Sequence, residues 1–61
     1  MVAVGYTSEG EIKEFRCING ILSCWGEDLV SLEVPVGVKY VRCEDNKLTE
    51  LIIPNGVKEV S

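Results

Sequence analysis

Hydrophobic positions in the second half of the chain are separated by three residues, then two, and then by longer gaps. An amphipathic helix repeats its apolar positions every 3.6 residues and a half-buried strand every second residue, so neither element gives this spacing. The spacing favours a coil that turns a corner every few residues and sends one apolar side chain inward at each corner. It occurs twice: in Leu29, Leu32 and Val34, and in Leu48, Leu51 and Ile53.

The two occurrences belong to an internal repeat of nineteen residues. Residues 24–42 align with residues 43–61 without gaps and share eight identities. A period this short excludes the helical repeat proteins, whose units exceed 30 residues. The identical pairs are Cys24/Cys43, Leu29/Leu48, Leu32/Leu51, Pro35/Pro54, Gly37/Gly56, Val38/Val57, Lys39/Lys58 and Val41/Val60.

Each repeat is predicted to contain one short strand. Val41 and Cys43 alternate as inward positions of that strand. Asp45–Asn46 then turns the chain, and Pro54 keeps the return arm extended and non-helical. The outward positions of the strand are Tyr40, Arg42 and Glu44.

The pattern V38-x-x-V41-x-C43-x-x-N46-x-L48-x-x-L51-x-I53-P54 resembles the leucine-rich repeat, and its short period is similar to that of bacterial leucine-rich-repeat proteins. The match is strong over residues 38–54 and good over residues 22–61. The resemblance implies a β-solenoid whose strand face holds protein partners. Glu27 stands where Asn46 stands one repeat later, so the first turn is expected to lack the hydrogen bonds of the asparagine.

Residues 1–20 do not follow the period. Their pattern predicts an antiparallel meander with strands near residues 2–6, 11–18 and 21–25, of which the third is also the first strand of the solenoid. Asn19–Gly20, between two apolar runs, is a strong hairpin signal. The meander is expected to cap the apolar end that a solenoid otherwise exposes.

The predicted fold class is therefore all-β: a β-solenoid of leucine-rich-repeat type capped by an N-terminal antiparallel meander or hairpin. The chain is expected to form one domain, with the cap at residues 1–20 and the coils at 21–61. The coils divide into residues 22–40 and 41–59, and a third coil starts at residue 60.

Composition and charge narrow the choice of partners. The 61 residues carry a net charge of −4 and are 46% hydrophobic, which suits a globular domain. An acidic chain is not expected to bind nucleic acid or an anionic membrane, since both attract positive surfaces. No apolar stretch reaches the length of a membrane span, and no signal-peptide pattern is present. A cytoplasmic location is the expectation, with export without a cleavable signal left open.

Cofactors and catalysis have little support in the sequence. Cys17, Cys24 and Cys43 fall on expected inward positions, where cysteine packs as a small hydrophobic residue. A Cys24–Cys43 disulfide and a metal site remain as alternatives. There is no histidine to serve as a base, so we expect neither an enzyme nor a cofactor. The acidic pairs Glu27–Asp28 and Glu44–Asp45 favour solvated turns over a calcium site.

The outward positions supply the candidate site. Trp, Tyr and Arg are the residue types that dominate binding hot spots. Trp25 can alternatively cover the cap or the edge of the core. The predicted function is a protein-protein interaction module whose partner, of unknown identity, contacts Trp25, Tyr40, Arg42, Arg16, Glu44 and Ser23.

A structural role is the alternative function. The last predicted strand has no neighbour on one side, and an unpaired edge strand readily pairs with another chain. Self-association through residues 56–61, with Val57 and Val60 at the edge, would give a homo-oligomer. Continuation into further repeats would instead make these residues the front of a longer repeat protein.

Overall fold

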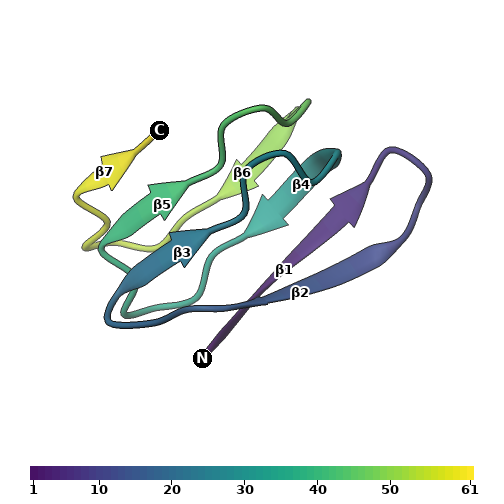
Figure 1. Cartoon of the computed structure of the whole chain (residues 1–61). Coiled ribbons are helices and arrows are strands. Elements are labelled where there is room, and N and C mark those ends of the chain that lie inside the picture. The colour runs from purple at the N-terminus through teal and green to yellow at the C-terminus, as the bar shows by residue number, and fades with distance from the viewer.

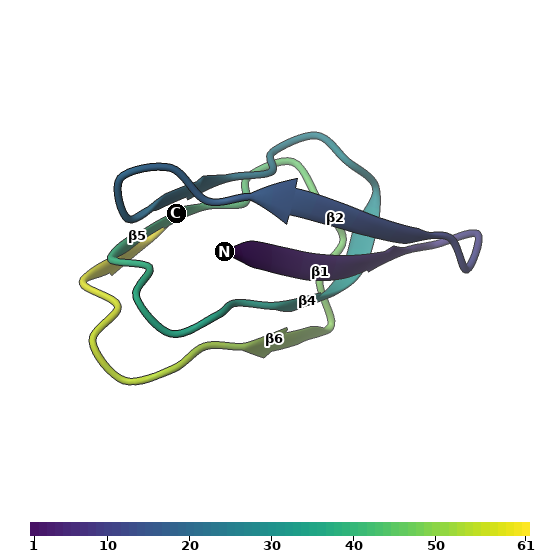
Figure 2. The ribbon, with the colours of Figure 1, turned by 90° about the horizontal axis from the view of Figure 1, so that it is seen from below.

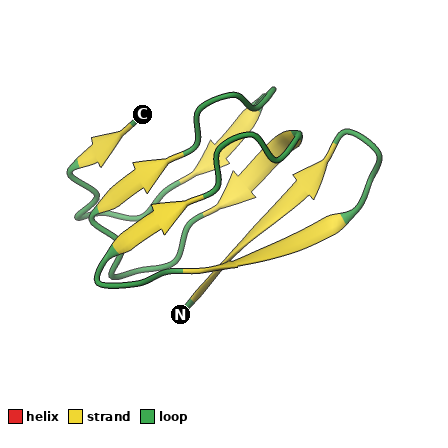
Figure 3. Ribbon diagram, in the orientation of Figure 1, coloured by secondary structure: helices red, strands yellow, loops and turns green.

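The computed structural model describes residues 1–61 and consists of strands, turns and loops (Figures 1 and 3). The all-β prediction is confirmed, and among these elements there is no helix that could span a lipid bilayer. The seven strands are β1 (Val2–Thr7), β2 (Ile12–Arg16), β3 (Ile21–Ser23), β4 (Leu29–Glu33), β5 (Tyr40–Arg42), β6 (Glu50–Ile52) and β7 (Glu59–Val60).

The strands form two small open sheets. One sheet has the order β2-β1-β4-β6 and the other the order β3-β5-β7. From β3 onward the chain passes from one sheet to the other with every strand, as Figures 1 and 2 show. All strand pairs formed after β3 are parallel, whereas β1 pairs antiparallel with both β2 and β4.

The parallel pairs join residues that lie nineteen positions apart. Leu22 is the register partner of Val41, which in turn is the partner of Val60. In the other sheet Leu32 is the partner of Leu51. The sequence repeat therefore has a direct structural meaning, because aligned residues of the two repeats are neighbours in the sheets.

The return arm is a strand in each repeat, which corrects the prediction of one strand per repeat. Leu29 and Leu32 are both buried although three positions separate them. A regular strand would turn one of the two outward. The register between β1 and β4 shifts between Tyr6 and Thr7, and this irregularity lets both leucines face the core.

The core lies between the two sheets and belongs mainly to the first repeat and β1. Phe15, Cys17, Leu48 and Val57 are partly buried against it. The buried hydrophobic residues are Ala3, Leu22, Cys24, Leu29, Leu32, Val34, Val38, Val41 and Cys43.

The predicted three-stranded meander is wrong. The first two strands form a hairpin near the predicted positions, but β3 pairs with β5 in the other sheet. The place beside β4 is taken by β1, whose inward residues include Ala3 and Gly5. A Cβ atom on Gly5 would lie 2.8 Å from Leu29 Cδ2, so β1 can approach the leucine layer closely only with glycine there. The hairpin thus covers the first repeat through β1.

Asn19–Gly20 forms the tight turn that the sequence indicates. Ile18 and Ile21 exchange backbone hydrogen bonds of 3.0 and 2.9 Å across it. Asn19 has φ 53° and Gly20 has φ 77°, as a two-residue hairpin turn of this type requires. The Ile18–Ile21 bridge is an isolated pair that does not extend into a longer hairpin. The turn therefore serves as the corner at which the chain passes from one sheet to the other.

Candidate binding surfaces

The outward face of the β3-β5-β7 sheet carries most of the predicted binding residues. Ser23 is the register partner of Arg42, and Tyr40 lies between Ile21 and Glu59. The buried Leu22 and Val41 alternate with these exposed side chains, as predicted for the strand. Tyr40 keeps 39% of its surface exposed although it sits in the middle strand.

Trp25 lies two residues after the end of β3 and is 61% exposed. It is not among the hydrophobic side chains packed against the core, which is evidence against the alternative that it covers the core edge. The indole lines an open hollow of about 390 Å³ together with Arg42, Glu44 and Asp45. The structure thus brings Trp25, Arg42 and Glu44 together, beside the row that contains Tyr40 and Ser23.

Backbone hydrogen bonds fix the position of this hollow. The Cys24 amide donates to the Arg42 carbonyl at 2.8 Å, and the Gly26 amide donates to the Glu44 carbonyl at 2.9 Å. Trp25 lies between these two bonds, which place its backbone beside the segment from Arg42 to Glu44. Its side chain is exposed, but its backbone is anchored.

Arg16 does not belong to this surface, which corrects its predicted role. It ends β2, where its register partner is Val2 of the four-stranded sheet. The prediction placed Arg16 beside Trp25 because it assumed that β2 and β3 pair. The chain crosses to the other sheet between these strands.

Asn46 fastens the turns of the two repeats to each other. Its Oδ1 accepts hydrogen bonds from the amides of Glu27 and Leu29, both at 2.9 Å. Its Nδ2 donates to the carbonyls of Cys24, Cys43 and Glu44. The first repeat therefore receives its turn bonds from the asparagine of the second repeat.

The acidic pairs lie in turns, and Glu27, Asp28 and Glu44 each have a side-chain partner. Asp28 and Asp45 adopt φ values of 60° and 57°, the left-handed region that aspartate tolerates in turns. Glu27 makes an ion pair with Lys13 at 3.1 Å, and Asp28 accepts a hydrogen bond from the Ser8 hydroxyl. Glu44 accepts a hydrogen bond from the Ser61 hydroxyl at 3.2 Å.

The three cysteines are free thiols in different environments. Cys24 and Cys43 are buried in the core, as predicted for inward positions. Cys17 is only partly buried. Burial, together with the smaller effects of the nearby Cys43 and Glu27, raises the pKa of the Cys24 thiol to about 12. The Cys43 thiol, whose pKa is also raised by burial, donates to the Ser61 carbonyl at 3.3 Å.

The second repeat leaves its apolar side chains open. Leu32 is 2% exposed and its counterpart Leu51 is 36% exposed; Val41 is 1% exposed and its counterpart Val60 is 43% exposed. Val57, the counterpart of the buried Val38, is partly buried. The predicted edge residues Val57 and Val60 therefore lie at one open end of the molecule, formed by the free edges of β6 and β7.

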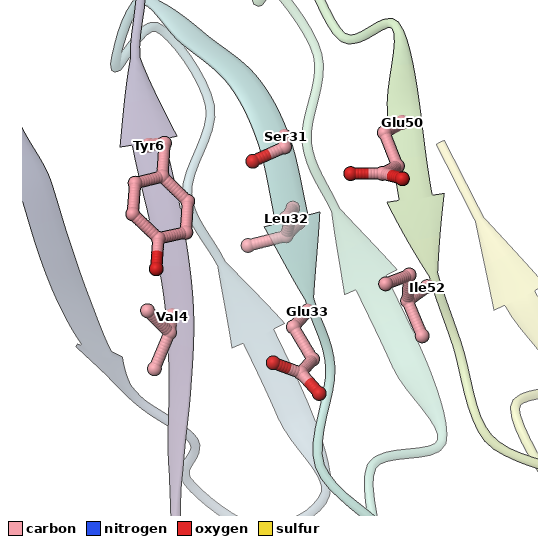
Figure 4. A pocket seen from close by; sticks show the side chains of 7 residues that line it. All are labelled: Val4, Tyr6, Ser31, Leu32, Glu33, Glu50 and Ile52. Atoms are coloured by element: carbon pink, nitrogen blue, oxygen red, sulfur yellow. The ribbon is translucent and has the colours of Figure 1, made fainter. Parts of the chain in front are cut away.

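Sequence reasoning missed a second exposed face, on the outside of the four-stranded sheet. A shallow hollow there, shown in Figure 4, is lined by residues of β1, β4 and β6. The sequence pattern predicted one strand per repeat and only an extended return arm, so the pairing of β4 and β6 that forms this face was not predicted. The lining residues are Val4, Tyr6, Ser31, Leu32, Glu33, Glu50 and Ile52.

Comparison with known proteins gave no relative: no family model, no curated protein and no solved structure matches the chain.

Proposed function

We propose that this chain is a protein-protein interaction module that holds its partner on the outward face of β3, β5 and β7. The fold we propose for it is a short β-solenoid similar to the leucine-rich repeat, with the β1–β2 hairpin as its cap. The nineteen-residue register of both parallel ladders and the asparagine that bridges successive turns support this fold.

The exposure of Trp25 carries the functional proposal. A solvent-exposed tryptophan presents a large apolar ring, and a partner that covers it gains free energy by removing that area from water. Its backbone is fixed by the hydrogen bonds on either side, so the ring needs little additional ordering when a partner binds. Tyr40 and Arg42 extend the same surface with residue types that concentrate binding energy.

The charge of the face indicates the chemistry of the partner. Glu44, Asp45 and Glu59 contribute three carboxylates beside the single guanidinium of Arg42. Complementary partners present the opposite charge at such a surface. We therefore expect a partner segment that places an apolar side chain against Trp25 and a lysine or arginine beside the carboxylates.

The test is selection of binding peptides from a random displayed library on the immobilised 61-residue protein. The enriched peptides are expected to combine an apolar and a basic residue and to change the fluorescence of Trp25, the only tryptophan. Tyr40→Ala should weaken their binding by roughly tenfold or more, the size of a hot-spot residue. The melting temperature should change little because the Tyr40 side chain lies outside the core.

Tyr6→Ala is the matched control. Tyr6 is 45% exposed, close to the 39% of Tyr40, but it lies on the other sheet. Binding measured by calorimetry should be unchanged in Tyr6→Ala and reduced in both Tyr40→Ala and Trp25→Ala. Equal affinity for all three variants, or a library that yields no enriched sequence, would contradict a binding role for this face.

A further inference from the structure

The first repeat binds the second through a set of backbone amides and carbonyls. The second repeat presents the equivalent groups at the open end of the molecule. The carbonyls of Leu29 and Val30 accept the amides of Lys47 and Thr49, both at 2.9 Å. The amide of Val34 donates to the Ile52 carbonyl at 2.9 Å. The corresponding groups nineteen residues later have no backbone partner: the carbonyls of Leu48 and Thr49 and the amide of Ile53.

The edge formed by β7 at the same end also has backbone carbonyls whose counterparts one repeat earlier are bonded. The Lys39 carbonyl accepts the Lys58 amide at 2.7 Å, and the Val41 carbonyl accepts the Ser61 amide at 2.9 Å. Their counterparts, the carbonyls of Lys58 and Val60, lie on the free side of β7. Two separate edges, one in each sheet, therefore present unpaired acceptors on the same end of the molecule.

The turn between these edges also contains backbone amides that could donate to a further hydrogen-bond partner. In the first repeat, the amides of Glu27 and Leu29 are both bonded to Asn46 Oδ1. The equivalent amides of the second repeat belong to Asn46 and Leu48, and neither donates to any acceptor in the chain. They are spaced to receive one side-chain oxygen, which an asparagine nineteen positions further along a repeat would supply.

We infer that this open end binds one more coil with the same nineteen-residue pattern, in parallel register and with its asparagine bonded to the amides of Asn46 and Leu48. Such a coil would pair with β6 and β7 at once and cover Leu51, Ile53 and Val60. A single added strand would satisfy only one of the two edges.

A second copy of this chain does not fit the same description. Its other end has β2 and β3 at the edges, and there Glu27, which is ion-paired with Lys13, stands where a repeat places its asparagine. The side chain of Asn46 is directed to the first repeat of its own chain, where it makes all its hydrogen bonds. A like-end dimer would thus bring no asparagine to the free amides. The occupant is therefore a coil that follows the repeat and carries an asparagine at the position of Asn46.

The experiment extends the intact chain by a second copy of residues 43–61 attached after Ser61. Hydrogen exchange of the Asn46 and Leu48 amides, followed by NMR, is expected to slow by roughly tenfold or more relative to the original chain, as local opening becomes less favourable. The midpoint of urea unfolding should rise together with this protection.

A matched variant replaces only the asparagine of the added copy by alanine. We expect it to keep the added apolar contacts but to lose the extra protection of the Asn46 and Leu48 amides. Unchanged exchange at these amides in the extended chain would overturn the inference. So would a concentration-dependent dimer of the original chain, seen by sedimentation, in which both amides are already protected. Neither result affects the peptide-binding test of the β3-β5-β7 face.

Discussion

At the scale of single residues, Asn46 has the greatest structural effect. It lies in a turn, yet one side chain makes five hydrogen bonds to backbone groups of both repeats. Unpaired amides and carbonyls in a partly buried turn are costly, because water cannot replace their lost partner fully. The turn can thus close without strand pairing at that point because Asn46 supplies the hydrogen bonds.

Asn46→Ala is expected to lower the free energy of unfolding by about 2–4 kcal/mol, since two amides and three carbonyls lose a partner together. Urea titration followed by circular dichroism measures the change. Asn55→Ala is the control, because Asn55 is exposed and its side chain makes no hydrogen bond; its stability should change by less than about 0.5 kcal/mol. Equal losses in the two variants would argue against the role of Asn46.

The Cys24 thiol predicts a loss of stability in alkaline solution. Burial holds its pKa at about 12 in the folded protein, whereas the unfolded thiol ionises near 9.0. The unfolded state therefore releases its proton first, and the free energy of unfolding falls as pH rises from 9 towards 12. The contribution of Cys24 is about 1.4 kcal/mol per pH unit in this window and vanishes below it.

The measurement compares urea unfolding of the original chain and Cys24→Ala between pH 7 and pH 11. The difference between their slopes isolates the contribution of Cys24, because all other side chains are the same in both proteins. Parallel curves would show that the thiol is not protected in the folded state.

At the scale of elements, the two repeats have the same sequence pattern but different burial. The first repeat has β1 on one side and the second repeat on the other, whereas β6 and β7 have a neighbour on one side only. Identical leucines are therefore expected to contribute unequal free energies.

Leu32→Ala should cost about 2–4 kcal/mol, because it removes a side chain that is buried from both sides. Leu51→Ala removes the same atoms from a position that is 36% exposed and should cost less than about 1.5 kcal/mol. Thermal unfolding of the two variants measures the difference. Equal costs would mean that the end formed by Leu51 is already covered in solution.

The sequence predicted some elements well for a physical reason. Repeated residues such as Leu32 and Leu51 occupy equivalent places, so alignment revealed the register, and alternation around Val41 revealed which side chains face inward. Alignment of repeats could not predict how segments outside the repeat pair with other strands. Nothing in VAVGYT states that β1 pairs with β4, so the meander and the position of Arg16 were predicted wrongly. Trp25 was ambiguous because exposure depends on the neighbouring coil.

At the scale of the whole molecule, stability is expected to decrease from the capped end to the open end. The hairpin covers one end of the core, and the core residues of the second repeat are only partly enclosed. Local opening should therefore begin at β6 and β7, where few apolar contacts resist it.

Thiol labelling measures this gradient with reporters already in the chain. Cys17 is partly buried and should react first with a thiol reagent, Cys43 next by opening of the second repeat, and Cys24 last. Variants that retain one cysteine each give the three rates by mass spectrometry. Labelling of Cys24 and Cys43 at one common rate would indicate that the chain opens only as a unit.

The nineteen-residue register also bears on how such a chain could arise. One side of a repeat fits the other side of its neighbour, since the same groups recur in the same positions on each. A tandem duplication of the coding segment would therefore insert a unit that fits at the moment it appears, with no compensating substitutions. The hairpin has no such counterpart, so lengthening by this route is possible within residues 24–61 and not within residues 1–17.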